Sequence, residues 1–162
     1  MNKIKAIFFD IDGTLIPFGR KEMSKETIDA LNMLKEKGVK IFVASGRGIL
    51  EQGVVTKDVA FDGYITLNGQ ICLDKDYNLY HGNSIHPEDF EVLHRVFQNK
   101  ELPAVLIEEK RAYINYVDEF AEKIHKEIGI KASPIDVYKG DKVYQMILYA
   151  DKAYADKLFE KL

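Results

Sequence analysis

The sequence predicts an α/β fold built on a parallel sheet, followed by a smaller α+β module. Apolar runs at residues 4–9, 39–44 and 64–67 have the length of buried strands, and each ends abruptly in polar residues. A segment of helical periodicity separates the first two runs, and this strand–helix–strand order is typical of a parallel sheet. From about residue 83 the order of elements changes. We therefore expect a core domain at 1–82 and a second domain at 83–162.

The first helix is predicted between the first two strands. Ser24 is a suitable N-cap, an apolar stripe follows it, and Gly38 is a suitable stop. Because both flanking runs are continuously apolar, we expect a sheet buried on both faces. A right-handed crossover would bring the carboxyl ends of its parallel strands to one edge.

A short helix and loop are expected at 48–60, and after the third strand a hairpin is expected from 70–73 and 78–81, turning at 74–76. The second domain should contain three helices, a hairpin and a further strand. The predicted elements are a helix from Pro87, a hairpin of 104–108 with 112–116, a helix capped by Asp118 and stopped by Gly129, a strand at 142–149, and a helix opened by Asp151. The apolar faces expected for the last two helices are Phe120, Ile124 and Ile128, and Tyr154, Leu158 and Leu162.

Composition excludes several classes of function. A net charge of −3 offers no basic face for nucleic acid. No apolar run approaches the roughly 20 residues of a membrane span, and the first residues lead directly into the predicted strand, which leaves no room for a signal peptide. Cys72 is the only cysteine and is expected in the core, so a reducing cytoplasm suits the chain. The four histidines show no ligand spacing and are expected at the surface or at helix caps.

Two carboxylates follow the first strand, Asp10 and Asp12, with Gly13 and Thr14 directly after them. Acids at the end of a buried strand carry a desolvation cost unless a cation or a phosphorylated ligand offsets it. Because the chain leaves the strand here and Gly13 allows a tight turn, both acids can converge on one Mg²⁺ ion and one phosphoryl group. The alternative is a turn in which the two acids only cap backbone amides.

The next two strand ends carry Ser45, Gly46 and Arg47, and then Asn68 with Gly69. A hydroxyl, exposed amides and a guanidinium suit phosphate oxygens, and open α/β sheets bind ligands at the carboxyl ends of their strands. The alternatives are that Ser45 caps the next helix and that Asn68 belongs to an ordinary turn.

These motifs resemble those of the haloacid dehalogenase-like (HAD) superfamily of phosphohydrolases. Residues 10–15, Asp-Ile-Asp-Gly-Thr-Leu, match its first signature, and Ser-Gly-Arg at 45–47 matches its second. Residues 65–70 are similar to the third-strand segment of the Cof-like branch, in which an α+β cap domain is inserted after the third strand. The resemblance implies a Rossmann-like core, present here as its N-terminal part only, with the cap beginning near residue 83.

The resemblance also implies roles. Asp10 would be the nucleophile and a Mg²⁺ ligand, and Asp12 the general acid and base, giving its backbone carbonyl to the metal. Thr14, Ser45, Gly46, Arg47 and Asn68 would bind the substrate. The expected reaction is hydrolysis of a small phosphorylated metabolite through an aspartyl-phosphate, with no nucleic acid or membrane as partner.

The chain departs from the family pattern in one respect. The family's third-motif lysine and fourth-motif acids follow the cap, and neither is present here. We therefore expect this sequence to be part of a longer phosphatase. The alternatives are a short relative that acts as a binding or assembly module, with a possible homo-oligomer through an exposed sheet edge, and a phosphoaspartate receiver domain. The receiver is disfavoured because its phosphoacceptor should follow the third strand.

Overall fold

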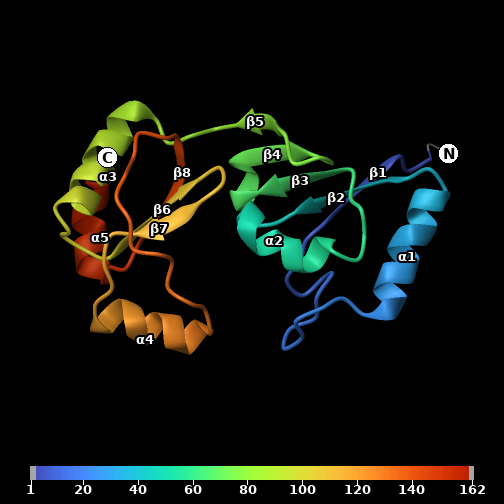
Figure 1. Ribbon diagram of the computed structural model, residues 1–162, viewed down its shortest axis with the longest axis horizontal. Helices are drawn as coiled ribbons and strands as arrows, with labels where there is room; N and C mark the ends of the chain where they lie inside the picture. Colours follow the sequence, from blue (N-terminus) through green and yellow to red (C-terminus); the bar gives the residue numbers. More distant parts are fainter. Residues whose placement is uncertain (1–2, 161–162) are drawn as a thin grey trace. The chain divides into compact units, whose positions relative to one another are not determined.

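The computed structural model describes residues 3–160, and the chain divides into two compact units, Met1–Asn83 and Ser84–Leu162 (Figure 1). Unit 1 contains a five-stranded sheet in the order β1-β2-β3-β4-β5. Its first three strands are parallel, and β4 is antiparallel to both of its neighbours, β3 and β5. The α/β prediction is therefore confirmed.

The elements of unit 1 are β1 (Ala6–Phe9), α1 (Lys25–Glu36), β2 (Lys40–Ala44), α2 (Ile49–Thr56), β3 (Gly63–Thr66), the 3₁₀ turn η1 (Leu67–Gly69), β4 (Ile71–Asp74) and β5 (Leu79–Gly82).

Helix α1 begins and ends where the sequence predicts. The Ser24 side chain accepts a hydrogen bond of 3.2 Å from the Thr27 amide, which satisfies one of the free N–H groups of the first turn. Beyond the last turn, Gly38 adopts a φ of 76°, a left-handed conformation that favours glycine. Local chemistry alone therefore sets both ends of this helix.

The prediction of a sheet buried on both faces is wrong for β1. Phe8 is 56% exposed, and Ile4, which precedes the strand, is 69% exposed. By contrast, Ile41 and Val43 of β2 are fully buried. Within the described chain, the Phe8 ring stacks on the Phe42 ring at a centroid distance of 4.8 Å. A continuous apolar run could not distinguish a strand covered on two faces from one covered on a single face.

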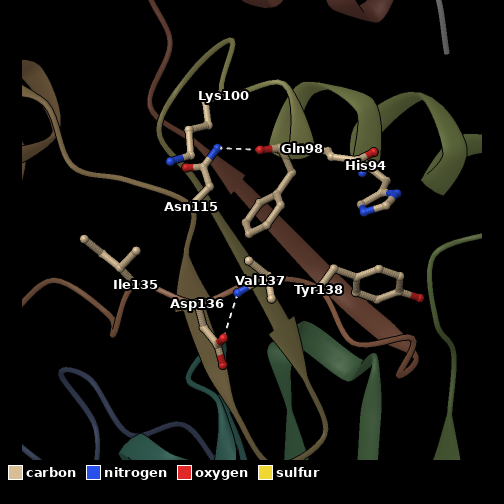
Figure 2. Close-up of a pocket in the computed structure, with 9 residues that line it drawn as sticks. His94, Gln98, Lys100, Asn115, Ile135, Asp136, Val137 and Tyr138 are labelled. Atoms are coloured by element: carbon tan, nitrogen blue, oxygen red, sulfur yellow. Dashed lines mark hydrogen bonds between the residues drawn. The ribbon is translucent and has the colours of Figure 1, made fainter.

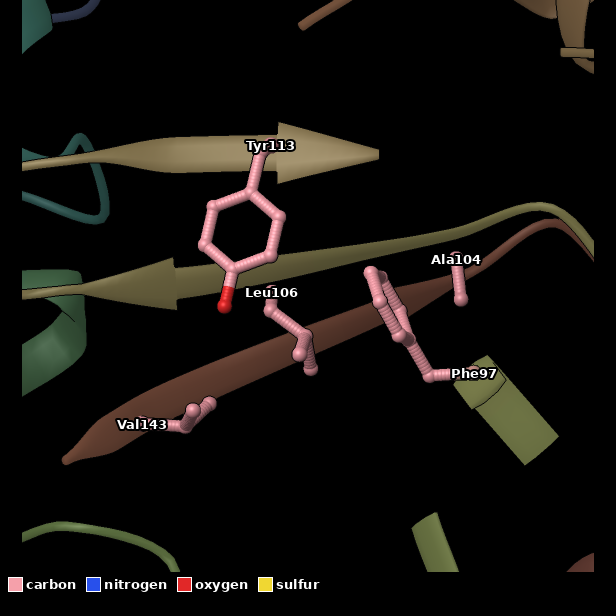
Figure 3. Packing of buried hydrophobic residues seen from close by; sticks show 5 residues of the cluster. All are labelled: Phe97, Ala104, Leu106, Tyr113 and Val143. Carbon is pink, nitrogen blue, oxygen red and sulfur yellow. The ribbon is translucent and has the colours of Figure 1, made fainter. Parts of the chain in front are cut away.

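Unit 2 contains an antiparallel sheet in the order β7-β6-β8. Its elements are α3 (Pro87–Gln98), β6 (Ala104–Glu108), β7 (Ala112–Ile114), α4 (Glu119–Ile128), β8 (Val143–Leu148) and α5 (Lys152–Phe159). On one face of the sheet, Phe97 of α3 packs against Leu106 of β6 and Tyr113 of β7, as Figure 3 shows. On the other face, Ala121 of α4 packs against Val105 of β6. The sheet thus has a hydrophobic core on each side, as an α+β module requires.

Helix α4 buries only part of the predicted face. Ile124 packs against the core, as predicted, but Phe120 and Ile128 are 46% and 60% exposed. The buried positions are instead Ala121 and His125, which an i, i+4, i+8 stripe of large residues did not indicate. Its predicted ends are confirmed, because the Asp118 carboxylate accepts from the Ala121 amide and Gly129 is left-handed.

The expectation that the histidines lie at the surface or at caps is wrong for His125. It is 5% exposed, and its Nε2 lies 2.6 Å from the Tyr149 hydroxyl. This hydrogen bond compensates the desolvation of a buried imidazole, so the residue serves as a polar element of the core. Cys72, expected in the core, is only partly buried. Leu162, expected to continue the last helix, lies outside the described residues.

Candidate active site

The acidic loop that follows β1 is held by two buried anchors. Ile11 and Leu15 are 0% and 2% exposed, and the Leu15 amide donates to the Asp10 carbonyl at 3.2 Å. The side chains between and before these anchors, those of Asp10, Asp12 and Thr14, are exposed. The loop therefore fixes its backbone in the core while it presents two carboxylates and a hydroxyl to solvent.

Gly13 is required by this loop. Its φ is 81°, and a Cβ at this position would lie 2.8 Å from the Phe18 ring. Phe18 itself is 87% exposed. Any larger residue at position 13 would therefore strain the backbone and displace the aromatic ring beside the acids.

Ser45 follows β2 directly and is buried. Ser45 is 7% exposed, its amide donates to the Ile65 carbonyl of β3 at 3.0 Å, and its hydroxyl accepts from the Arg47 amide at 3.2 Å. The N-cap of α2 is Gly48, without a side-chain cap. The alternative in which Ser45 caps the next helix is thus wrong, and its hydroxyl instead shapes the loop that carries Arg47.

The residues that follow β3 are hydrogen-bonded to those that follow β2. The Asn68 amide donates to the Ser45 carbonyl at 3.2 Å, and the Leu67 amide donates to the Arg47 carbonyl at the same distance. Residues 67, 68 and 69 all have positive φ, of 50°, 55° and 98°. For leucine and asparagine this conformation costs free energy, and three in succession are unlike an ordinary turn.

Asn68 lies close to Gly46 because of this backbone arrangement. A Cβ at Gly46 would be 3.0 Å from Asn68 Oδ1 and 3.4 Å from its Nδ2. The glycine leaves room for the amide side chain to approach the second strand end. The polar ends of β2 and β3 thus form one continuous surface.

Arg47 joins this surface to the acidic loop. Its Nε donates to Asp12 Oδ2 at 2.9 Å and its Nη2 to Asp12 Oδ1 at 2.6 Å, a bidentate pair. These hydrogen bonds hold the pKa of the Asp12 carboxyl below its ordinary value, and the same pair raises the pKa of Arg47. The charge of Asp10 adds to the shift in Arg47, so both acids act on one guanidinium.

Gln52 of α2 is a site residue that the sequence did not reveal. It is fully buried, and its Nε2 donates to the Arg47 carbonyl at 3.1 Å. Within residues 3–160 its Oε1 is the buried side-chain atom that has no hydrogen-bond partner. No motif marks a glutamine at this position, and only the fold shows that it supports the Arg47 loop.

The predicted residues therefore meet at one edge of the sheet. Asp12, Ser45, Gly46, Arg47 and Asn68 are joined by the contacts above. In the described part of the chain, the side chains of Asp10 and Thr14 form no hydrogen bond, so an unpaired carboxylate lies beside the paired one. A carboxylate, a hydroxyl, a guanidinium and an amide gathered in this way can bind and polarise a phosphate group.

Mg²⁺ is the metal that the resemblance implies for this site. Among residues 3–160, no three His, Cys, Asp or Glu side chains cluster closely enough to hold a metal. Mg²⁺ commonly binds through one or two carboxylates, with water and phosphate oxygens completing an octahedron. The Asp10 carboxylate and the Asp12 backbone carbonyl fit that mode in kind and would supply two of its ligands.

The chain matches the family described as haloacid dehalogenase-like hydrolase over residues 7–162. It belongs to this family. Among curated relatives, "Putative phosphatase YkrA" of Bacillus subtilis is 25% identical, and the match covers 93% of this chain and 61% of the relative. A "Putative phosphatase" of Haemophilus influenzae is 27% identical over 83% of this chain and 50% of its own length. The chain thus spans about half to three fifths of the length of these HAD relatives.

Solved HAD structures agree with the fold. The phosphatase BT1666 of Bacteroides thetaiotaomicron superposes with a TM-score of 0.82 at 25% identity, covering 98% of this chain and 60% of that one. The subclass IIB sugar phosphatase BT4131 superposes with a TM-score of 0.74 at 28% identity, covering 96% of this chain and 62% of that one. A Geobacillus kaustophilus protein at 23% identity and a TM-score of 0.87 supports the fold alone, over 98% of this chain and 62% of that one.

The described helices include none long and apolar enough to cross a bilayer.

Proposed function

We propose that this chain carries the nucleophile-bearing part of a Mg²⁺-dependent phosphatase that hydrolyses small phosphate monoesters. The observation that carries the proposal is the bidentate Arg47–Asp12 pair, which joins the ends of β1 and β2 beside the unpaired Asp10 carboxylate. A phosphate dianion placed there would meet a nucleophile, a guanidinium and the Ser45 hydroxyl together. Small sugar phosphates or phosphorylated cofactors are the proposed substrates, and the sugar phosphatase BT4131 supports the first of these.

In the first half of the reaction, an Asp10 carboxylate oxygen bonds to phosphorus while the ester P–O bond breaks. Asp12 transfers a proton to the departing oxygen, so that an alcohol and an aspartyl-phosphate result. In the second half, water attacks the same phosphorus, Asp12 takes its proton, and the bond to Asp10 breaks to release inorganic phosphate. Mg²⁺, held by Asp10 and the Asp12 backbone carbonyl, would offset the repulsion between carboxylate and phosphate.

Arg47 must leave Asp12 for this sequence to operate. As long as the guanidinium donates to both carboxylate oxygens, Asp12 has a lowered pKa and carries no proton to give. A substrate phosphate competes for the guanidinium, because it offers a second bidentate acceptor. Substrate binding would therefore free Asp12 at the moment when its proton transfer is needed.

The test uses the full-length protein with 4-nitrophenyl phosphate and Mg²⁺. Replacement of Asp10 by Asn should lower kcat by at least about a thousandfold, since it removes the nucleophile. Asp29→Asn, at an exposed position of α1, is the matched control and should leave kcat unchanged. Activity retained in Asp10→Asn would overturn the assignment of the nucleophile.

A second proposal is association through the β1 edge. β1 lies at the end of the strand order and leaves Phe8 and Ile4 exposed, a feature that natural sheets usually cover. Sedimentation should show a dimer of the wild-type chain that Phe8→Lys converts to a monomer. Tyr80→Lys, at a still more exposed aromatic on the opposite edge strand β5, should not affect it. A monomer at all concentrations would refute this proposal.

We also propose a cytoplasmic location, with a small phosphorylated metabolite and no nucleic acid or membrane as partner. The net charge of −3 and the single free cysteine, Cys72, support it.

A further inference from the structure

Unit 2 has a pocket of about 460 Å³ that shares no residue with the candidate active site. Its volume lies within the roughly 300–1,000 Å³ typical of small-molecule sites. It is formed by the last turns of α3, the residue after β7 and a segment before β8 that has little regular structure (Figure 2). The lining residues are His94, Phe97, Gln98, Lys100, Asn115, Ile135, Asp136, Val137 and Tyr138.

Apolar side chains form much of this pocket. Phe97 is a buried residue of the core beneath it, and Ile135 and Val137 are 68% and 66% exposed at its rim. At one end, His94 and Tyr138 meet edge to face at a centroid distance of 4.7 Å. Large apolar side chains left in water around a concavity favour a ligand with an apolar body.

Of the charged side chains that line the pocket, the acidic one is paired within the described chain and the basic one is not. Asp136 accepts from Lys139 at 2.8 Å and from Arg111 at 3.5 Å, so its charge is already compensated. Asn115 is buried. Its Nδ2 donates to the carbonyls of residues 97 and 102, and its Oδ1 accepts from the amides of residues 104 and 116. Lys100, by contrast, has no acidic partner within residues 3–160 and lies opposite the His94–Tyr138 end in Figure 2.

Lys100 also occupies an unfavourable backbone conformation. Its φ is 54°, and its amide donates to the Phe97 carbonyl just after the end of α3, where glycine is the usual residue. A lysine in this left-handed position costs free energy that a glycine would not.

We propose that this pocket binds a small organic anion with a flat aromatic or heteroaromatic body. The ring system lies on Phe97 and Val137 and reaches the His94–Tyr138 pair, and the anionic group, a carboxylate or a phosphate, pairs with the Lys100 ammonium. None of the pocket's residues belongs to the strand ends that carry Asp10 and Asp12.

The experiment is an NMR titration of the amide-labelled full-length protein with 2-naphthoate, and with the neutral 2-naphthamide for comparison. Naphthoate should shift the amides of residues 94–100 and 135–138, and leave those of residues 10–14 and 45–47 in place. Because the ammonium is exposed, Lys100→Gln should weaken naphthoate about fivefold, the effect of one surface ion pair, and leave naphthamide unchanged. Lys131→Gln, an exposed lysine of the same unit, is the matched control.

A second variant adds charge instead of removing it. Val137→Glu places a carboxylate at the rim and should weaken naphthoate more than naphthamide, while the rest of the spectrum reports that the fold is intact. Repeating the titration with 2-naphthyl phosphate in Asp10→Asn without Mg²⁺ tells whether the pocket prefers phosphate or carboxylate. The proposal is overturned if naphthoate and naphthamide bind equally, if the shifts gather elsewhere, or if no shifts occur.

Discussion

The guanidinium of Arg47 and the carboxylate of Asp12 form a bidentate pair, with Nε–Oδ2 and Nη2–Oδ1 distances of 2.9 and 2.6 Å. These residues are 35 positions apart in sequence and follow two neighbouring parallel strands, β1 and β2. Under the proposed function, a phosphate bound at this surface would compete with Asp12 for one cation.

Arg47→Lys should separate binding from folding. Lysine keeps the charge but cannot donate a bidentate fork, so we expect KM for 4-nitrophenyl phosphate to rise about tenfold. The free energy of unfolding should fall by less than about 1 kcal/mol, because both side chains are more than a third exposed. Steady-state kinetics and urea denaturation measure the two effects. A large loss of stability would show that the pair is chiefly structural.

The titration of Asp12 should depend on Arg47. The pKa of Asp12 is lowered in the folded chain, so the pair stabilises the fold above the ordinary aspartate pKa of 3.8 and loses this effect as pH falls through the lowered value. In NMR titrations the Asp12 carboxyl carbon should titrate below 3.8 in the wild type and closer to it in Arg47→Gln. Coincident curves in the two proteins would contradict the prediction.

Gln52→Met should change stability little and ligand binding more. Methionine loses the hydrogen bond to the Arg47 carbonyl but also removes the unpaired Oε1, so we expect a change within about 1 kcal/mol. Gln52→Ala, the control, adds a cavity and should cost about 2 kcal/mol or more. KM should rise severalfold in both variants, because the Arg47 loop loses its support. An unchanged KM would remove Gln52 from the site.

Lys100→Gly should make the chain more stable while it removes the cation of the unit 2 pocket. Relief of the left-handed lysine favours the fold, and the greater freedom of glycine in the unfolded state opposes it, which leaves a net gain of roughly 0.5 kcal/mol. Chemical denaturation measures this gain, with Lys131→Gly as an exposed control. A variant less stable than the wild type would show that the lysine side chain stabilises the fold.

Secondary structure followed from local chemistry at many positions. Ser24, Asp118 and Asp151 each accept a hydrogen bond from an amide of the helix that they open, as their residue types predict. Such caps act within one turn of chain, so a sequence contains them in full. Which face α4 buries depends on the elements that pack against it, and the same holds for the exposure of β1. The sequence does not say which elements those are.

The acidic loop is where sequence and tertiary structure divide most clearly. The sequence by itself determined that Asp10 and Asp12 end a strand and that Gly13 must turn the chain, because these requirements are local. Only the tertiary structure decided that Arg47 donates to the Asp12 carboxylate and that Asn68 packs beside Gly46. It also decided that Gln52 donates to the Arg47 carbonyl. Those contacts join residues from different strand ends and a helix, and their geometry exists only once the sheet has aligned its strands.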